Sequence, residues 1–134
     1  MSSPLFSRIA ARNADYFYFF FRVLTGFLFL GHGLQKVGLL EGTFAVQGFM
    51  GFIGICEFAG GIALMVGLWT RLVAILGTIL LIGAYATVHA RQGFLPIVNQ
   101  GELALLYIAA FAILFAHGAG IGSLERMLFK KESF

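Results

Sequence analysis

Long stretches without a charged residue constrain this chain more than any other feature of its sequence. No residue between Arg71 and Arg91 is charged, and none between Glu102 and Glu125. Each stretch is close to the roughly 20 apolar residues that an α-helix needs to cross the hydrocarbon core of a bilayer. Charged residues make up only 11% of the 134 residues, while hydrophobic ones make up 60%. A soluble surface requires about twice that charged share, so the composition excludes an ordinary water-soluble domain.

The hydropathy pattern predicts four membrane-spanning helices in a single membrane domain that covers residues 1–134. We place the spans at about 16–35, 48–68, 72–90 and 103–121, with a short tail at 122–134. The expected fold class is all-α, an integral membrane four-helix bundle. Only a short link joins the second and third spans, so these two helices are expected to be antiparallel neighbours.

The distribution of basic residues predicts the orientation of the spans. Six basic residues fall on one side, namely Arg8, Arg12, Arg71, Arg126, Lys130 and Lys131, and two on the other, Lys36 and Arg91. Basic residues are enriched on the cytoplasmic side of membrane proteins, so both termini are predicted to be cytoplasmic. The net charge of +3 is explained by this topology and not by nucleic-acid binding.

Periodic small residues indicate how the helices pack. On the first helix, one stripe carries a cation at each end and is expected to face the bundle: Arg22, Gly26, Phe29, Gly33 and Lys36. Small residues also recur every four positions on two other helices, as Ala59, Ala63 and Gly67 and as Ala112, Ala116 and Gly120. Such stripes let helices approach closely, and packing within one chain is a simpler explanation for them than a dimer interface.

Two ionisable residues interrupt the first two spans, Arg22 and Glu57. Each charge left unpaired near the centre of a bilayer costs about 2.5–3.5 kcal/mol on insertion scales. Helix geometry puts Arg22 roughly 10 Å and Glu57 roughly 16 Å from the same side, which a long arginine side chain can bridge. The sequence therefore predicts an intramembrane Arg22–Glu57 ion pair. Two interpretations stay open: a proton or ligand site, and a structural pair that fixes the register of two helices.

Further polar residues are predicted to gather at the outer ends of the helices. The candidate quinone or ligand site consists of His32, Lys36, Glu57, Tyr85, His89, Asn99 and Glu102. His32 and His89 are expected at similar depth, and Tyr85 and His89, four residues apart, share one helix face. Simpler explanations compete: Asn99 and Glu102 read as a capping box for the fourth helix, Lys36 can snorkel to the interface, and water can satisfy His89.

Metal, haem and nucleotide chemistry lack sequence support. There is no H-x-x-H or E-x-x-H pair, so neither a metal ion nor a haem is expected. P-loop, G-x-G-x-x-G and G-x-S-x-G patterns are also absent from the sequence. The single cysteine, Cys56, excludes an internal disulfide.

The order of these motifs resembles the DoxX family of small prokaryotic four-helix membrane proteins. The resemblance covers about residues 22–125 and rests on five groups of residues: Arg22 with Gly26; Gly31-His32-Gly33 with Lys36; the run from Glu57 through Gly60-Gly61, Gly67-Leu68 and Thr70-Arg71; His89, Asn99-x-Gly101-Glu102 and Tyr107; and Gly118-x-Gly120-x-x-Ser123-Leu124-Glu125. Glu125 departs from the aspartate that is more usual there, which weakens any role for that carboxylate.

The resemblance implies a multi-pass protein of the prokaryotic plasma (inner) membrane that serves redox systems of sulfur, thiol or oxidant-stress chemistry. The leading hypothesis is an accessory or coupling subunit that binds a quinone and is not catalytic alone, with a redox enzyme or further copies of the chain as partners. Two alternatives remain: a small oligomeric transporter or channel that uses Arg22 and Glu57, and an assembly factor without a ligand.

Overall fold

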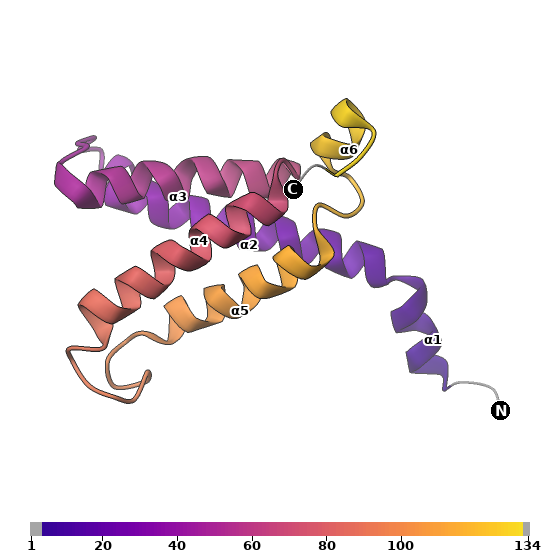
Figure 1. The fold of residues 1–134 in the computed structure, drawn as a ribbon, viewed down its shortest axis with the longest axis horizontal. Coiled ribbons are helices and arrows are strands. Elements are labelled where there is room, and N and C mark those ends of the chain that lie inside the picture. The colour runs from indigo at the N-terminus through magenta and orange to yellow at the C-terminus, as the bar shows by residue number, and fades with distance from the viewer. Residues whose placement is uncertain (1–3, 133–134) are drawn as a thin grey trace.

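The computed structural model describes residues 4–132, and these are helical with no strand among them. The four long helices are α2 (Ala14–Lys36), α3 (Gly48–Val66), α4 (Thr70–Ala84) and α5 (Glu102–His117). A π-helical turn, η2 (Tyr85–His89), extends α4, and the short 3-10 helix η1 (Leu39–Glu41) lies between α2 and α3. Two short helices, α1 (Leu5–Arg12) and α6 (Leu124–Phe129), flank the long ones (Figure 1).

The predicted spans agree well with the helices, and the all-helical prediction is confirmed. Three helical segments are long and apolar enough to cross a membrane: Ala14–Lys36, Gly48–Val66 and Thr70–His89. The fourth, α5, is apolar but has only 16 residues and ends at His117, four residues before the predicted end. It stops there because Gly118 adopts a φ of 75° and Gly120 a φ of 66°, which no helix can continue.

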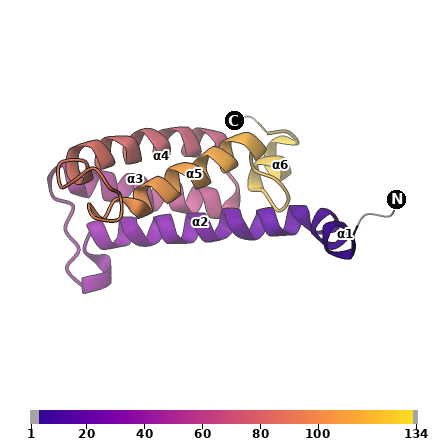
Figure 2. The same ribbon diagram turned by 90° about the horizontal axis from the view of Figure 1, so that it is seen from below.

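The long helices form two antiparallel pairs, α2 with α3 and α4 with α5 (Figures 1 and 2). The link between α3 and α4 is a Schellman turn: Gly67, with a φ of 69°, ends α3, and the Leu68 amide bonds to the Ala63 carbonyl at 2.8 Å. The expected antiparallel direction of these two helices follows from this turn. However, α3 and α4 diverge from the link, so they pack against each other far less than the members of each pair do.

Paired glycines form the contact between α2 and α3. A Cβ atom at Gly26 would lie 2.8 Å from the Gly61 carbonyl oxygen, and one at Gly54 would lie 3.2 Å from the Gly33 carbonyl oxygen. Both glycine pairs are seven residues apart along each helix, so they fix one antiparallel register. The predicted inward face of the first helix is confirmed, since Arg22, Gly26, Phe29 and Gly33 are buried.

The predicted small-residue stripes are not the packing seam. Ala59 of α3 and Ala112 and Ala116 of α5 are exposed, Ala63 and Gly120 are half-buried, and only Gly67 is buried.

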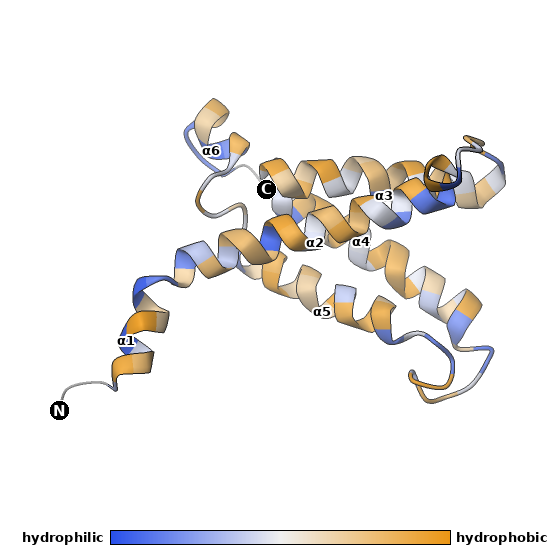
Figure 3. Ribbon diagram, turned by 180° about the vertical axis from the view of Figure 1, so that it is seen from behind, coloured by the Kyte–Doolittle hydropathy of each residue, from blue (hydrophilic) through white to orange (hydrophobic). Residues whose placement is uncertain are grey.

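The core joins all four long helices. Its buried side chains are Phe29 of α2, Leu64 of α3, Ala74 and Leu81 of α4, and Tyr107, Phe111 and Leu114 of α5. Apolar residues also cover the outer faces, and hydrophilic ones gather toward the helix ends (Figure 3). Both α1 and α6 lie at one end of the long helices, and the 37–47 and 90–101 connections lie at the other (Figures 1 and 2).

Candidate functional site

An ion pair between two of the long helices joins Lys36, the last residue of α2, to Glu57 in the middle of α3. The Lys36 ammonium donates to both carboxylate oxygens of Glu57, at 2.7 and 2.5 Å. The Glu57 side chain is only 3% exposed, while that of Lys36 is 25% exposed. A carboxylate this buried requires a charged partner, and the direct contact with Lys36 supplies one.

This pair lies in the wall of a groove between α3 and α4. The groove has a volume of about 560 Å³ and opens where the two helices diverge. Its lining combines the ion pair with apolar side chains from both helices, chiefly Phe49, Met50 and Ile53 of α3 and Leu76, Ile79 and Leu80 of α4. Lys36 and Glu57 are the only charged residues in that lining. The arrangement is therefore an apolar groove with one ionic contact.

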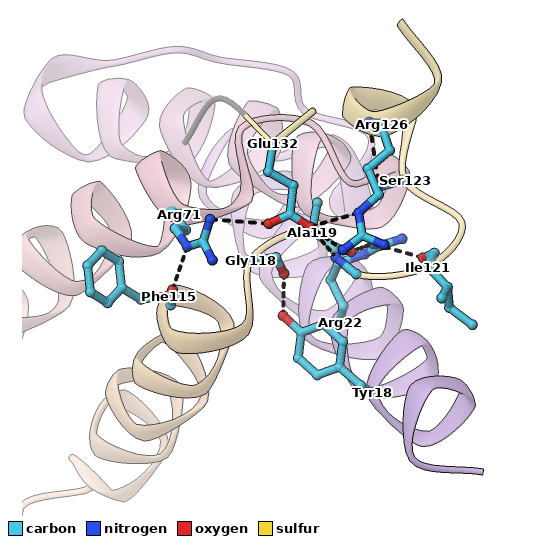
Figure 4. Close-up of polar contacts among 11 residues, drawn as sticks. Tyr18, Arg22, Arg71, Phe115, Gly118, Ala119, Ile121, Ser123, Arg126 and Glu132 are labelled. Atoms are coloured by element: carbon cyan, nitrogen blue, oxygen red, sulfur yellow. Dashed lines mark hydrogen bonds and ion pairs between the residues drawn. The ribbon is translucent and has the colours of Figure 1, made fainter. Parts of the chain in front are cut away.

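The predicted Arg22–Glu57 ion pair is wrong. Arg22 is fully buried, but its guanidinium donates to backbone carbonyls of the segment after α5: Ala119, Ile121 at 3.3 Å and Gly122 at 3.0 Å (Figure 4). The physical reason is the direction of helical side chains, which tilt toward the helix N-terminus. That tilt aims Arg22 away from Glu57, and it aims Lys36 and Glu57 toward each other across the antiparallel pair.

Around Arg22, the segment 118–123 is held by a second group of polar contacts (Figure 4). The Tyr18 hydroxyl donates to the Gly118 carbonyl at 2.5 Å, and Arg71 donates to the Phe115 carbonyl at 3.0 Å. Glu132 accepts from Arg71 at 3.1 Å and from Arg126 at 2.9 Å. Sequence reasoning missed Tyr18 and Glu132, because no local motif links Tyr18 to Gly118, 100 positions away, or Glu132 to Arg71, 61 positions away.

Asn99 organises the outer connection between η2 and α5. Its side chain is fully buried, donates to the Gly93 carbonyl at 2.8 Å and the Tyr85 hydroxyl at 3.3 Å, and accepts the Gly101 amide at 2.8 Å. The His89 ring nitrogen Nδ1 lies 2.9 Å from the Asn99 carbonyl oxygen. The structure thus brings Tyr85, His89 and Asn99 together, as expected.

The predicted capping box is wrong. The N-cap of α5 is Gly101, and no side chain caps that helix. Because the Asn99 carboxamide closes its own turn onto the Gly101 amide, it does not reach the helix amides beyond. Glu102, the first residue of α5, is exposed.

Among the described residues, His32 makes no hydrogen bond to either group, but it lies close enough to Lys36 and Glu57 to interact with their charges. Its ring packs edge-on against Tyr107, with 5.7 Å between ring centroids. No hydrogen bond or ring contact joins His32 to His89 in the described part of the chain. The seven residues of the predicted site therefore fall into the Lys36–Glu57 pair with His32 near it, the Tyr85–His89–Asn99 group, and the exposed Glu102. Within residues 4–132, no three His, Cys, Asp or Glu side chains lie close enough together to hold a metal ion.

Comparison with known proteins agrees with the family resemblance of the sequence motifs. A family model described as DoxX matches residues 17–90. An uncharacterised protein of Haemophilus influenzae is 36% identical over 127 residues, covering 87% of this chain and 93% of its own length. A Bacillus subtilis protein named "Putative oxidoreductase CatD" is 33% identical over 116 residues, covering 81% of this chain and 84% of its own. No solved structure matches.

Proposed function

Because the chain belongs to the DoxX family of membrane proteins, we propose that it is an accessory subunit of a quinone-linked redox system in the prokaryotic inner membrane, with both termini in the cytoplasm. The observation that carries this proposal is the Lys36–Glu57 ion pair in the wall of the apolar groove between α3 and α4. A quinone combines an isoprenoid tail, which suits an apolar groove, with carbonyl oxygens that accept hydrogen bonds.

The chemistry of the pair suits a quinone head group. Lys36 already donates to Glu57, and an ammonium has three N–H groups, so it can donate to a ligand carbonyl as well. Ionisable groups inside membrane proteins usually line a pathway for protons or substrate. Reduction of a quinone consumes two electrons and two protons, and a lysine–carboxylate pair at the head group is suited to pass those protons.

The electrons require a partner protein. The connections between the long helices are short, at 37–47, 67–69 and 90–101, so none can enclose a flavin or an iron–sulfur cluster. The name of the Bacillus subtilis relative is consistent with a redox context for this chain. We infer that the subunit binds quinone in the bilayer while an oxidoreductase supplies reducing equivalents.

The test is to purify the chain gently from its native membrane and to quantify bound isoprenoid quinone by mass spectrometry. The decisive variant is the double substitution Lys36→Met with Glu57→Met, which replaces the charged pair with apolar side chains of similar length. Such replacements often preserve or increase stability. We therefore expect this variant to fold but to lose bound quinone. Glu41→Gln is the matched control, because Glu41 is an exposed carboxylate at the same end of the helices.

Other outcomes would assign a different function. Quinone-free wild-type protein, or equal quinone in the double variant, would overturn the proposal. Ion flux through proteoliposomes that the double variant abolishes would favour the transporter. Loss of folded protein alone, without any ligand in the wild type, would favour the assembly factor.

A further inference from the structure

A carboxylate of the chain itself occupies a basic cradle at the end of the bundle remote from the groove. The cradle consists of Arg71 at the start of α4, Arg126 of α6, and the backbone amide of Gly120. The occupant is Glu132, in the segment after α6. This side chain is 14% exposed, and its two oxygens accept from all three donors (Figure 4).

Arg71 and the Gly120 amide are positioned by the fold, whereas the Arg126 side chain, which is 52% exposed, is oriented by Glu132 itself. Arg71 is oriented because its Nε also donates to the Phe115 carbonyl at the end of α5. Arg126 contacts one Glu132 oxygen through two nitrogens, Nε at 2.9 Å and Nη2 at 2.7 Å. The Gly120 amide reaches the same oxygen at 3.3 Å. A fork of guanidinium nitrogens and a backbone amide is the donor set that proteins use for oxyanions.

The backbone leaves space for a bound oxyanion. Gly118 and Gly120 both adopt positive φ angles, 75° and 66°. The Gly120 amide donates to the Glu132 carboxylate, whereas the Gly118 amide donates to the Leu114 carbonyl and the Gly118 carbonyl accepts from the Tyr18 hydroxyl. A Cβ atom at Gly118 would collide with the Glu132 carboxylate, and it would lie 2.9 Å from the Arg71 guanidinium carbon. Any residue larger than glycine would therefore fill the position that the oxyanion occupies.

Charge indicates which oxyanion fits. Within the cradle, Arg71 and Arg126 carry two positive charges and Glu132 neutralises one of them; the other nearby carboxylate, Asp15, lines the adjoining pocket. A phosphate monoester carries a charge of about −1.5 to −2 at neutral pH and has three strong acceptor oxygens. A polar pocket of about 430 Å³ adjoins the cradle, shares Gly120 and Arg126 with it, and also includes Asp15, Tyr18 and His117. This pocket provides room for a group larger than a carboxylate.

We propose that Arg71, Arg126 and the Gly120 amide form a binding site for a phosphate dianion, free or as a monoester, and that Glu132 blocks this site as an internal competitor. The dianion can come from inorganic phosphate or from the head group of phosphatidic acid. Binding displaces the Glu132 carboxylate and leaves the segment after α6 free of its two arginine contacts. The site is separate from the quinone groove, so it stands or falls independently of the proposed function.

The test measures phosphate binding to the full chain with and without the competitor. Inorganic phosphate is titrated calorimetrically into protein in detergent. In a second assay, the protein is reconstituted into phosphatidylcholine vesicles that contain phosphatidic acid, and the phosphatidic acid that stays bound is counted by native mass spectrometry. We expect Glu132→Gln to tighten binding about tenfold or more. The wild-type site is open only for a fraction of the time, and its apparent affinity is reduced in proportion to that fraction. Adding Arg126→Gln to that variant should abolish the gain. Glu41→Gln, the same charge change at an exposed site, should match the wild type.

The two sources of the dianion give different results. Tight binding of both probes by Glu132→Gln indicates a site open to free phosphate, whereas retention of phosphatidic acid alone indicates a lipid site. The proposal is overturned if Glu132→Gln binds neither probe more tightly than Glu41→Gln does. Should Glu132→Gln fail to fold, Glu132→Asp replaces it: the shorter side chain keeps the charge but cannot span both arginines, and unchanged binding there would equally refute the proposal.

Discussion

Replacing Gly61 with alanine tests whether the glycine seam holds α2 and α3 together. The added Cβ atom would lie 2.5 Å from the Leu30 amide nitrogen, 2.6 Å from the Leu30 Cβ atom and 2.7 Å from the Gly26 carbonyl oxygen. These distances are far below van der Waals contact, and two of the three atoms belong to the backbone. A backbone cannot rotate away as a side chain can, so the two helices must move apart.

The cost follows from two opposing effects. Overpacking a tight interface typically costs 1–3 kcal/mol, and contact with rigid backbone places Gly61→Ala in the upper half of that range. Alanine recovers about 0.5–1 kcal/mol through its better helix propensity. We expect a net loss of about 1–2.5 kcal/mol in the free energy of unfolding. Such a loss reduces the ratio of folded to unfolded protein by a factor of roughly 5–70.

Gly31→Ala is the matched control, because Gly31 lies in α2 but outside its contact with α3. Gly31 also lies within a long helix, but nothing lies within 4 Å of a Cβ atom built there. We therefore expect this variant to match the wild type or to gain up to about 0.5–1 kcal/mol from helix propensity. The assay is unfolding in one fixed detergent, followed by far-ultraviolet circular dichroism. Equal stability of Gly61→Ala and Gly31→Ala would refute the claim that close glycine packing holds α2 and α3 together.

Three further substitutions test the other polar contacts. Arg22→Lys should cost about 1–3 kcal/mol and speed proteolytic cleavage within 118–132, because the compact ammonium of lysine cannot reproduce the planar fork whose two nitrogens reach the three carbonyls; unchanged cleavage would contradict this. Asn99→Ala should cost a similar 1–3 kcal/mol and accelerate amide exchange over 93–101, since three side-chain hydrogen bonds are lost; slow exchange there would argue against it. Glu57→Gln alone should lower folded yield more than the double substitution with methionine at Lys36 and Glu57, because it leaves the half-buried Lys36 ammonium without its counter-charge; the reverse order would refute the pairing.

The helices themselves could be predicted from the sequence because lipid imposes a simple rule. Backbone groups in a bilayer must be satisfied within the segment, so an apolar stretch of sufficient length becomes a helix. The inward stripe on the first helix followed from periodicity alone, since Arg22, Gly26, Phe29 and Gly33 repeat with the helical turn. Glycines with positive φ, such as Gly118, set helix ends that hydropathy cannot locate.

Arg22 was the wrong partner to predict for Glu57, and the reason could have been found in the sequence. Estimating depth from helix rise treated each side chain as a point beside its own Cα atom. Helical side chains instead tilt toward the N-terminus, which moves Arg22 and Glu57 toward opposite ends of the antiparallel pair. The same tilt explains why Lys36, expected to snorkel outward, reaches inward to the Glu57 carboxylate at 2.5 Å.

The contacts of Asn99 and Glu132 could not have been found in this way. Each depends on the path of an irregular segment, 90–101 or 118–123, and no helical or strand period governs such segments. Buried Asn99 satisfies loop amides and carbonyls that have no partner in a regular element. A polar residue next to several glycines in a connection is the kind of signal that would have favoured this role over a capping box.

The α2 helix couples the two ends of the molecule, since it carries Arg22 at one polar group and Lys36 at the other. Its position relative to α3 is set by the two glycine pairs, Gly26 with Gly61 and Gly33 with Gly54. A shift of α2 along α3 would therefore move Lys36 relative to Glu57 and Arg22 relative to the 118–123 carbonyls at the same time. The seam thus has a positional role as well as a stabilising one. Gly61→Ala should accordingly weaken both polar groups together, which separates it from substitutions that act at one end only.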